Sequence, residues 1–149
     1  MKRHMLLKVQ IAGASRPATR QMGIGIVLSG TGFDAPVTLS DVAGWGTAME
    51  ATYVALIRAL HGILGFRACH GHRIAVIVAS DVEALVMQMR DAWDVHDEKL
   101  QRLHATAARL RDEFGVCRID LVSGGQIRQA RSMARQALVP QRQAEHVAA

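Results

Sequence analysis

Hydrophobic positions near the start of the chain recur every second residue, which is the period of a β-strand. Leu7, Val9 and Ile11 alternate with polar or small residues. A loop rich in turn-forming residues follows, and residues 23–28 and 37–42 then predict a second and a third strand. We therefore expect three strands joined by short turns, with the third strand at the edge of the sheet.

The pattern becomes helical from about residue 47 to residue 64, where apolar side chains share one helix face. The side chains on this face are Met49, Tyr53, Leu56, Leu60 and Ile63. Residues 65–73 are expected to connect this helix to the next strand. That strand is predicted at residues 74–78, because this run of β-branched residues is too short for a helix and reads as a buried strand.

A second helix is predicted directly after this buried strand. Its apolar side chains recur at three- and four-residue intervals and are Val82, Leu85, Val86 and Met89. Either Ser80 or Asp81 could cap this helix by accepting its first free N–H groups. Asp81 also lies at the carboxyl end of a strand, where open α/β sheets bind ligands and metals. The pattern alone leaves open whether this carboxylate is a helix cap or a functional group.

The last third of the chain predicts a helix, a strand and another helix. Apolar positions from 100 to 114 mark a long helix that ends at Gly115, and residues 116–122 form a fifth strand. A helix over residues 127–138 is stopped by Pro140. The polar residues 140–149 are expected to be a disordered tail. The order of elements predicts one α/β domain, residues 1–139, in which helices cover a mixed sheet.

The composition suits a single soluble domain, because 149 residues with 50% hydrophobic and 21% charged side chains can bury a core. No apolar run is long enough to cross a membrane, and the apolar run near the N-terminus is broken too early for a signal peptide. We expect a cytoplasmic protein that does not use a membrane. The formal net charge of +5 favours an acidic partner such as nucleic acid.

The two cysteines, Cys69 and Cys117, lack the spacing of a metal site and are expected to be free thiols. Cys69 is followed by His70 and His72. A His-x-His pair in a glycine-flanked loop, without clustered partners, is more often exposed to solvent than bound to a metal.

Four short motifs, in this order along the chain, resemble the ribonuclease H family. They are VQIAGASR with GIGIVL at residues 9–28, TAMEATYVALI at residues 47–57, ASD at residues 79–81, and LVSGGQIRQARSMARQAL at residues 121–138. The resemblance covers roughly residues 8–138. It implies that family's fold, a five-stranded mixed sheet in the order 3-2-1-4-5, flanked by helices.

The same resemblance implies where the family's four catalytic carboxylates would lie. In that family they hold two Mg²⁺ ions, which activate a water molecule and stabilise the leaving oxygen. The corresponding residues here are Ala12, Thr52, Asp81 and Arg131, and the family's proton-carrying histidine is matched by Leu121. Only Asp81 remains as a candidate metal ligand. One carboxylate beside a guanidinium is a poor magnesium site, so we expect no intact catalytic set and no cofactor unless some activity is retained.

Two other carboxylates are not expected to replace the missing ones. Glu50 precedes Thr52 by two residues, which turns its side chain about 200° around the helix. Asp120 lies inside the fifth strand, before the chain bends towards the site.

The residues that remain as candidates for binding a nucleic acid are positively charged. Arg16 and Arg20 lie in the first loop, while Arg128, Arg131 and Arg135 are spaced three and four apart on the last helix. This spacing puts the three on one helix face, which suits phosphate contacts but is more often simply a solvated surface. We interpret the chain as a catalytically inactive ribonuclease H-like domain that binds DNA, RNA or RNA/DNA hybrid through these arginines.

The family's asparagines that contact ribose 2′-hydroxyls correspond to other residues here, at positions 18–19 and 48–49. Recognition specific to a hybrid is therefore not expected.

Two alternative functions stay open. A protein-interaction or assembly module, such as a homodimer, would use the third strand or the Trp45 region. A residual metal-dependent ribonuclease would need Mg²⁺ and carboxylates that the sequence does not show. Whichever function holds, the resemblance brings Asp81 and Arg131 together, and we predict an ion pair between them at the former metal position.

Overall fold

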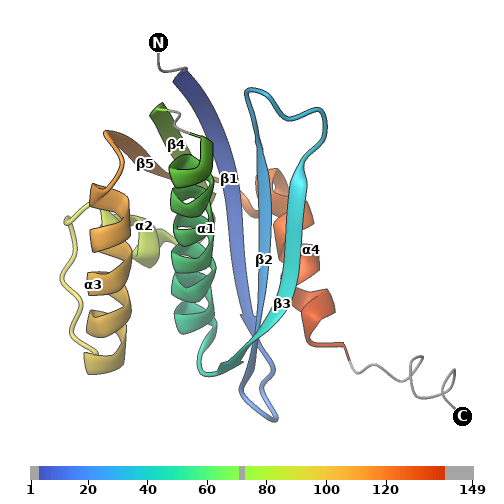
Figure 1. The fold of residues 1–149 in the computed structure, drawn as a ribbon. Coiled ribbons are helices and arrows are strands. Elements are labelled where there is room, and N and C mark those ends of the chain that lie inside the picture. Colours follow the sequence, from blue (N-terminus) through green and yellow to red (C-terminus); the bar gives the residue numbers. More distant parts are fainter. Residues whose placement is uncertain (1–3, 71–72, 140–149) are drawn as a thin grey trace, which may run out of the picture.

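One mixed sheet forms the centre of the molecule, and helices lie on both of its faces (Figure 1). The computed structural model describes residues 4–70 and 73–139, so the predicted disordered tail lies outside the described residues. The elements are β1 (His4–Ser15), β2 (Gln21–Gly30), β3 (Val37–Trp45), α1 (Ala48–His70), β4 (Arg73–Ser80), α2 (Glu83–Met89), α3 (Glu98–Asp112), β5 (Val116–Leu121), the 3₁₀ turn η1 (Gly124–Ile127) and α4 (Arg128–Ala137).

The strand order β3-β2-β1-β4-β5 confirms the predicted order. β1, β2 and β3 pair antiparallel, whereas β4 and β5 run parallel to β1. Parallel strands need long crossover connections, which α1 supplies before β4 and the α2–α3 pair before β5. β3 and β5 are therefore the two edges of the sheet, and the prediction of an edge for the third strand is confirmed.

The main core lies between the sheet and the helices α1, α2 and α3. Alternate side chains of β1, such as Leu7 and Ile11, are at most 1% exposed because they face this helix layer. Tyr53, Leu56 and Leu60 of α1 are fully buried against them. Among the residues described, none of the helices has the length and apolarity that crossing a bilayer requires.

α4 packs on the opposite face of the sheet, over β1 and β2 (Figure 1). Its Ala130 and Ala134 are buried against Ala12. Gly23 and Gly25 of β2 permit this approach, because a Cβ at either position would collide with the carbonyl oxygens of Ala134 and Ala130. The two glycines therefore set how closely α4 can lie on the sheet.

The first helix is longer than the sequence pattern predicts. α1 continues to His70, so the predicted connection over residues 65–73 is wrong for most of its length. Phe66 packs against the core, and the Arg67 guanidinium lies 5.4 Å from the centroid of the Phe114 ring. These tertiary contacts outweigh the low helix propensity of Gly65.

The last predicted helix begins later than expected. Residues 124–127 form the turn η1, and α4 starts only at Arg128. The Ser123 N–H donates to Oε1 of Gln126 at 2.9 Å, which fixes the turn before the helix. β1 and β3 also extend beyond the predicted strands, to Ser15 and Trp45.

Candidate functional site

Asp81 lies directly after β4, but it does not cap α2. The N-cap residue is Val82, which makes no side-chain cap, and α2 begins at Glu83. The Ser80 hydroxyl accepts a hydrogen bond from the Val82 N–H at 3.1 Å. The suggested capping role of Asp81 is therefore wrong, and its carboxylate interacts elsewhere.

The partner of Asp81 is Arg131 of α4. Nε of Arg131 lies 3.6 Å from Oδ2 of Asp81, which confirms the predicted ion pair. The two side chains are 46% and 25% exposed, so the pair is only partly removed from water. Gly124 leaves room for it, since a Cβ at that position would collide with Nη1 of Arg131. The sequence analysis did not predict that Gly124 makes room for Arg131. The only local signal for this role is that the residue is a glycine.

The ion pair borders a pocket of about 240 Å³. β1 contributes Ala12 and Gly13 to its wall, the end of β4 contributes Asp81, and α4 contributes Arg131 and Arg135. Two guanidinium groups and one carboxylate give this pocket a net positive charge. It therefore attracts anions and repels free cations.

The other residues at the family's carboxylate positions provide no metal ligand. Thr52 is 1% exposed, and its hydroxyl donates to the carbonyl oxygen of Ala48 at 2.9 Å. Ala12 is 4% exposed and has no side-chain oxygen. Mg²⁺ needs carboxylate oxygens and favours sites free of adjacent cations, so these residues do not fit it. Within residues 4–70 and 73–139, no group of three or more His, Cys, Asp or Glu side chains could hold a metal ion.

Glu50 and Asp120 do not stand in for the lost ligands, because both have other partners. The Glu50 carboxylate lies 2.8 Å from Nζ of Lys99 on α3. Asp120 accepts from Nε of Arg118 at 3.0 Å and lies 3.6 Å from Nη2 of Arg90. Neither carboxylate lines the pocket, as expected from their positions in the sequence.

The three candidate arginines of α4 do not act as one group. Arg131 and Arg135 both line the pocket, whereas Arg128 is exposed on the first turn of α4 and is not part of the lining. The structure therefore brings together two of the three side chains that helical spacing had placed on one face.

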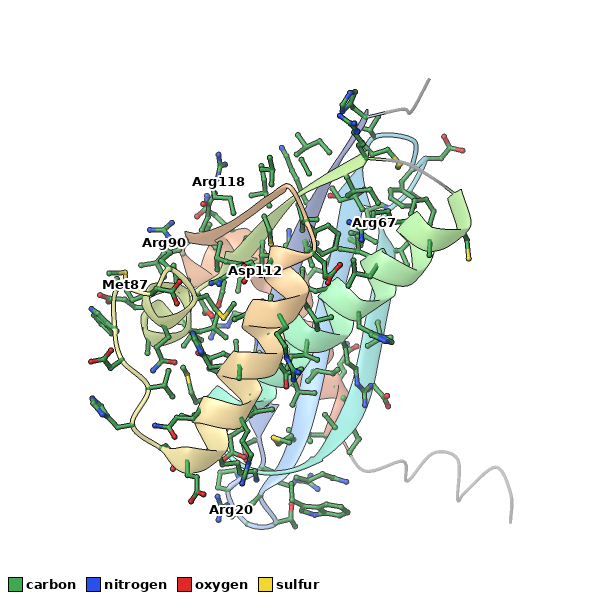
Figure 2. All side chains as sticks on the ribbon, turned by 60° about the vertical axis from the view of Figure 1, so that its left-hand side comes forward. Arg20, Arg67, Met87, Arg90, Asp112 and Arg118 are labelled. Carbon is green, nitrogen blue, oxygen red and sulfur yellow. The ribbon has the colours of Figure 1, made fainter. Side chains whose placement is uncertain are left out.

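The remaining candidates, Arg16 and Arg20, lie in the turn between β1 and β2. Arg20 is exposed at the end of this turn, directly before β2, with a φ of 61° (Figure 2). Because Ala134 of α4 packs against Gly23 just after the turn, the turn lies at the same end of the molecule as the last part of α4 (Figure 1).

The cysteines form no site with each other. Cys69 and Cys117 are both free, as predicted, and Cys69 is exposed. Burial raises the pKa of Cys117 to about 11, so this thiol is neutral and unreactive at physiological pH. The candidate His72 lies outside the described residues.

Comparison with known families gives a match over most of the chain. A family model described as reverse transcriptase-like matches residues 12–137. A search among curated proteins found no match.

Several solved structures are similar along almost their whole length. Ribonuclease H1 of the archaeon Halobacterium salinarum is 28% identical, with a TM-score of 0.78 over 89% of this chain and 97% of that one. The N-terminal ribonuclease H domain of a Mycobacterium tuberculosis protein is 22% identical, with a TM-score of 0.79 over 90% of this chain and 99% of that one. A ribonuclease H1 from compost, LC11, was solved with an RNA/DNA hybrid and is 23% identical, with a TM-score of 0.79 over 89% and 96% of the two chains. The latter two similarities establish a common fold.

Proposed function

The chain belongs to the reverse transcriptase-like family, and from this we propose that it is a ribonuclease H-like domain that binds nucleic acid without cleaving it. The observation that carries the proposal is the Asp81–Arg131 ion pair, which lies where the motif resemblance puts the family's metal ligands. Hydrolysis in this family depends on metal-activated water. A site with Ala12, Thr52 and Arg131 in place of three carboxylates offers no means of holding that metal.

Phosphate groups are the part of a nucleic acid that the pocket suits. Arg131 and Arg135 both border it, and guanidinium groups bind phosphate oxygens through paired N–H donors. Arg16 and Arg20 add two cations in the nearby turn, and the net charge of +5 adds attraction that does not depend on sequence. RNA/DNA hybrid is the first ligand to test, because the similar LC11 enzyme was solved with one.

Binding assays at several salt concentrations test this proposal directly. Arg20→Ala and Arg135→Ala should each weaken binding to hybrid, duplex DNA and duplex RNA alike, and should lower the salt slope by about one. Fluorescence anisotropy with labelled oligonucleotides measures both quantities. Arg102→Ala and Arg109→Ala, on the exposed side of α3, remove the same charge on the other face of the sheet and should have little effect. Unchanged binding in both Arg20→Ala and Arg135→Ala would contradict the proposal.

A cleavage assay tests the loss of catalysis separately. A labelled RNA/DNA hybrid should stay intact with a large excess of this protein in Mg²⁺ or Mn²⁺, while an active ribonuclease H cleaves it under the same conditions. Metal-dependent cleavage would instead support the residual nuclease.

A protein-interaction function is a second candidate, favoured by the exposed edge strand β3. Val37, Leu39, Val42 and Trp45 of this strand are 51%, 41%, 37% and 68% exposed. An apolar edge strand can pair with the edge of another chain, and the simplest partner is a second copy. Sedimentation should then show a dimer that Leu39→Lys dissociates. A monomer at all concentrations would exclude the homodimer.

A further inference from the structure

β4 and β5 are covered by helices on one face only. On that face Val76, Val78 and Ile119 are at most 3% exposed, in the core shared with α1, α2 and α3. On the other face α4 lies over β1, β2 and β3 rather than over β4 and β5, and among the described residues the 3₁₀ turn η1 also contacts β4 (Figure 1). Parallel strands are normally buried on both faces, so this open parallel region is a candidate binding surface.

Three rows of side chains cross this open region, as the register of the parallel strands establishes. The rows are Leu6–Ala75–Val116, Lys8–Ile77–Arg118 and Gln10–Ala79–Asp120. Together they define what we name the β1–β4–β5 face. The middle residue of each row comes from β4 and is alanine or isoleucine. All three residues of the first row are apolar. Leu6 and Val116 of that row are 40% and 58% exposed, which leaves apolar surface in contact with water.

The margins of the β1–β4–β5 face are positively charged. Lys8 is exposed on β1, and Arg118 on β5 has a side chain that is 62% exposed. Arg90 extends from the end of α2 to within 3.6 Å of Asp120, and Figure 2 shows it near Arg118. Three cations and one carboxylate give the margins a net positive charge.

We propose that the β1–β4–β5 face binds an amphipathic α-helix of a partner protein, with acidic residues along both margins of its apolar side. Lys8 and Arg118 lie on strands that flank β4, so their backbones are about 10 Å apart at the usual strand spacing. This matches the width of an α-helix with its side chains, about 10–12 Å. A helix along β4 would bury Ala75 and Ile77 and would bring its acidic margins next to Lys8 and Arg118.

A protein helix suits this face better than a nucleic acid does. Phosphates cannot cover the exposed Leu6 and Val116, whereas apolar side chains of a helix gain free energy by doing so. The face uses none of the arginines of α4, although its last row ends two residues before Ala12 and Asp81 of the pocket. The proposal therefore does not depend on nucleic-acid binding.

The test uses a designed helical peptide of about 18 residues, long enough to be helical in solution. Leu and Ala form its apolar side and Glu its margins; a matched peptide has Lys in place of Glu. The protein is compared with the double variant Lys8→Glu, Arg118→Glu. Arg102→Glu, Arg109→Glu on α3 is the control, since it makes the same charge change away from the face. Thermal unfolding verifies that all three are folded.

The Glu peptide should bind the unmodified protein and the control equally, and the Lys8→Glu, Arg118→Glu variant at least about tenfold more weakly. The Lys peptide should prefer that variant. Amide chemical shifts should change along residues 6–10, 75–79 and 116–120, and Ile77→Asn should weaken binding without a charge change. No binding of the Glu peptide, equal binding to the double variant, or shifts confined to β3 would overturn the proposal. The proposal would also be overturned if the Glu peptide did not bind and the Lys8→Glu, Arg118→Glu variant lost affinity for RNA/DNA hybrid.

Discussion

The partial exposure of the Asp81–Arg131 ion pair determines how much it stabilises the fold. Ion pairs that remain in contact with water contribute about 0–1 kcal/mol, whereas removing one partner of a deeply buried pair costs about 3–5 kcal/mol. With side chains 46% and 25% exposed, this pair belongs to the first kind. Arg131→Ala should therefore lower the free energy of unfolding by less than about 1 kcal/mol in urea denaturation. Arg128→Ala is the control on the same helix, and a loss above about 3 kcal/mol in Arg131→Ala alone would contradict the expectation.

Cys117 provides a test of burial at a single thiol. Burial disfavours the thiolate and raises the pKa of Cys117 from 9.0 to about 11. Iodoacetamide at pH 8 should therefore modify exposed Cys69 at least about tenfold faster than Cys117, as read by mass spectrometry. Because the folded pKa is the higher one, this thiol favours the folded state below pH 9 and loses that contribution as the pH rises towards 11. Equal rates of modification of Cys69 and Cys117 in the folded protein would contradict the burial of Cys117. The two rates should become equal only in denaturant.

At the scale of elements, the position of α4 depends on the glycines of β2. Gly25→Ala should destabilise the protein by about 1–3 kcal/mol, since the added Cβ collides with the Ala130 carbonyl and must displace the helix. Gly65→Ala is the matched control, because a Cβ there meets nothing within 4 Å. It should stabilise α1 by about 0.5–1 kcal/mol. Thermal unfolding measures both changes, and equal effects of the two substitutions would exclude this role of Gly25.

The existence and order of the elements could be predicted because each has a clear hydrophobic period and because four motifs resemble one family. The ends of the elements could not. The sequence placed a break at Gly65, but the contacts of Phe66 and Arg67 with distant parts of the chain extend α1 to His70. Such contacts are made by residues far apart in the sequence, so a local pattern does not contain them.

Only part of the site could be predicted, again because contacts between residues far apart in the sequence decide the rest. The pairing of Asp81 with Arg131 followed from aligning the motifs with a family whose acids converge there. The space that Gly124 leaves for the guanidinium, and the separation of Arg128 from the pocket, depend on how η1 turns the chain before α4. The spacing of residues within the last helix does not determine the direction in which the chain enters that helix.

At the scale of the whole molecule, positive charge is divided between two adjoining regions on the same face of the sheet. Arg131, Arg135 and the β1–β2 turn gather at one end, where the carboxyl half of β1 meets α4. Lys8, Arg90 and Arg118 surround the open part of β1, β4 and β5. The first surface surrounds a charged pocket and the second an apolar strip, so the proposed ligands differ although the net charge has the same sign. Raising the salt concentration should therefore weaken binding of nucleic acid more than binding of an amphipathic helix.

The pocket lies where β1, the end of β4 and α4 meet, and α1 packs against Gly13 of β1 through Ala51 and Thr52. Building a metal site from residues of all four elements therefore tests the assembled molecule. Ala12→Asp, Thr52→Glu and Arg131→Asp together would surround Asp81 with carboxylates, which repel one another unless a cation binds. At ten times its dissociation constant, Mg²⁺ should then stabilise the triple variant by about 1.4 kcal/mol. For a chain of this size that corresponds to a rise in melting temperature of roughly 3–6 °C. Calorimetry with Mg²⁺ and with EDTA measures it. Arg131→Asp alone and the unmodified protein should show no rise, because Ala12 and Thr52 supply no ligand. A similar rise in either of them, or none in a folded triple variant, would show that these positions do not converge on a metal site.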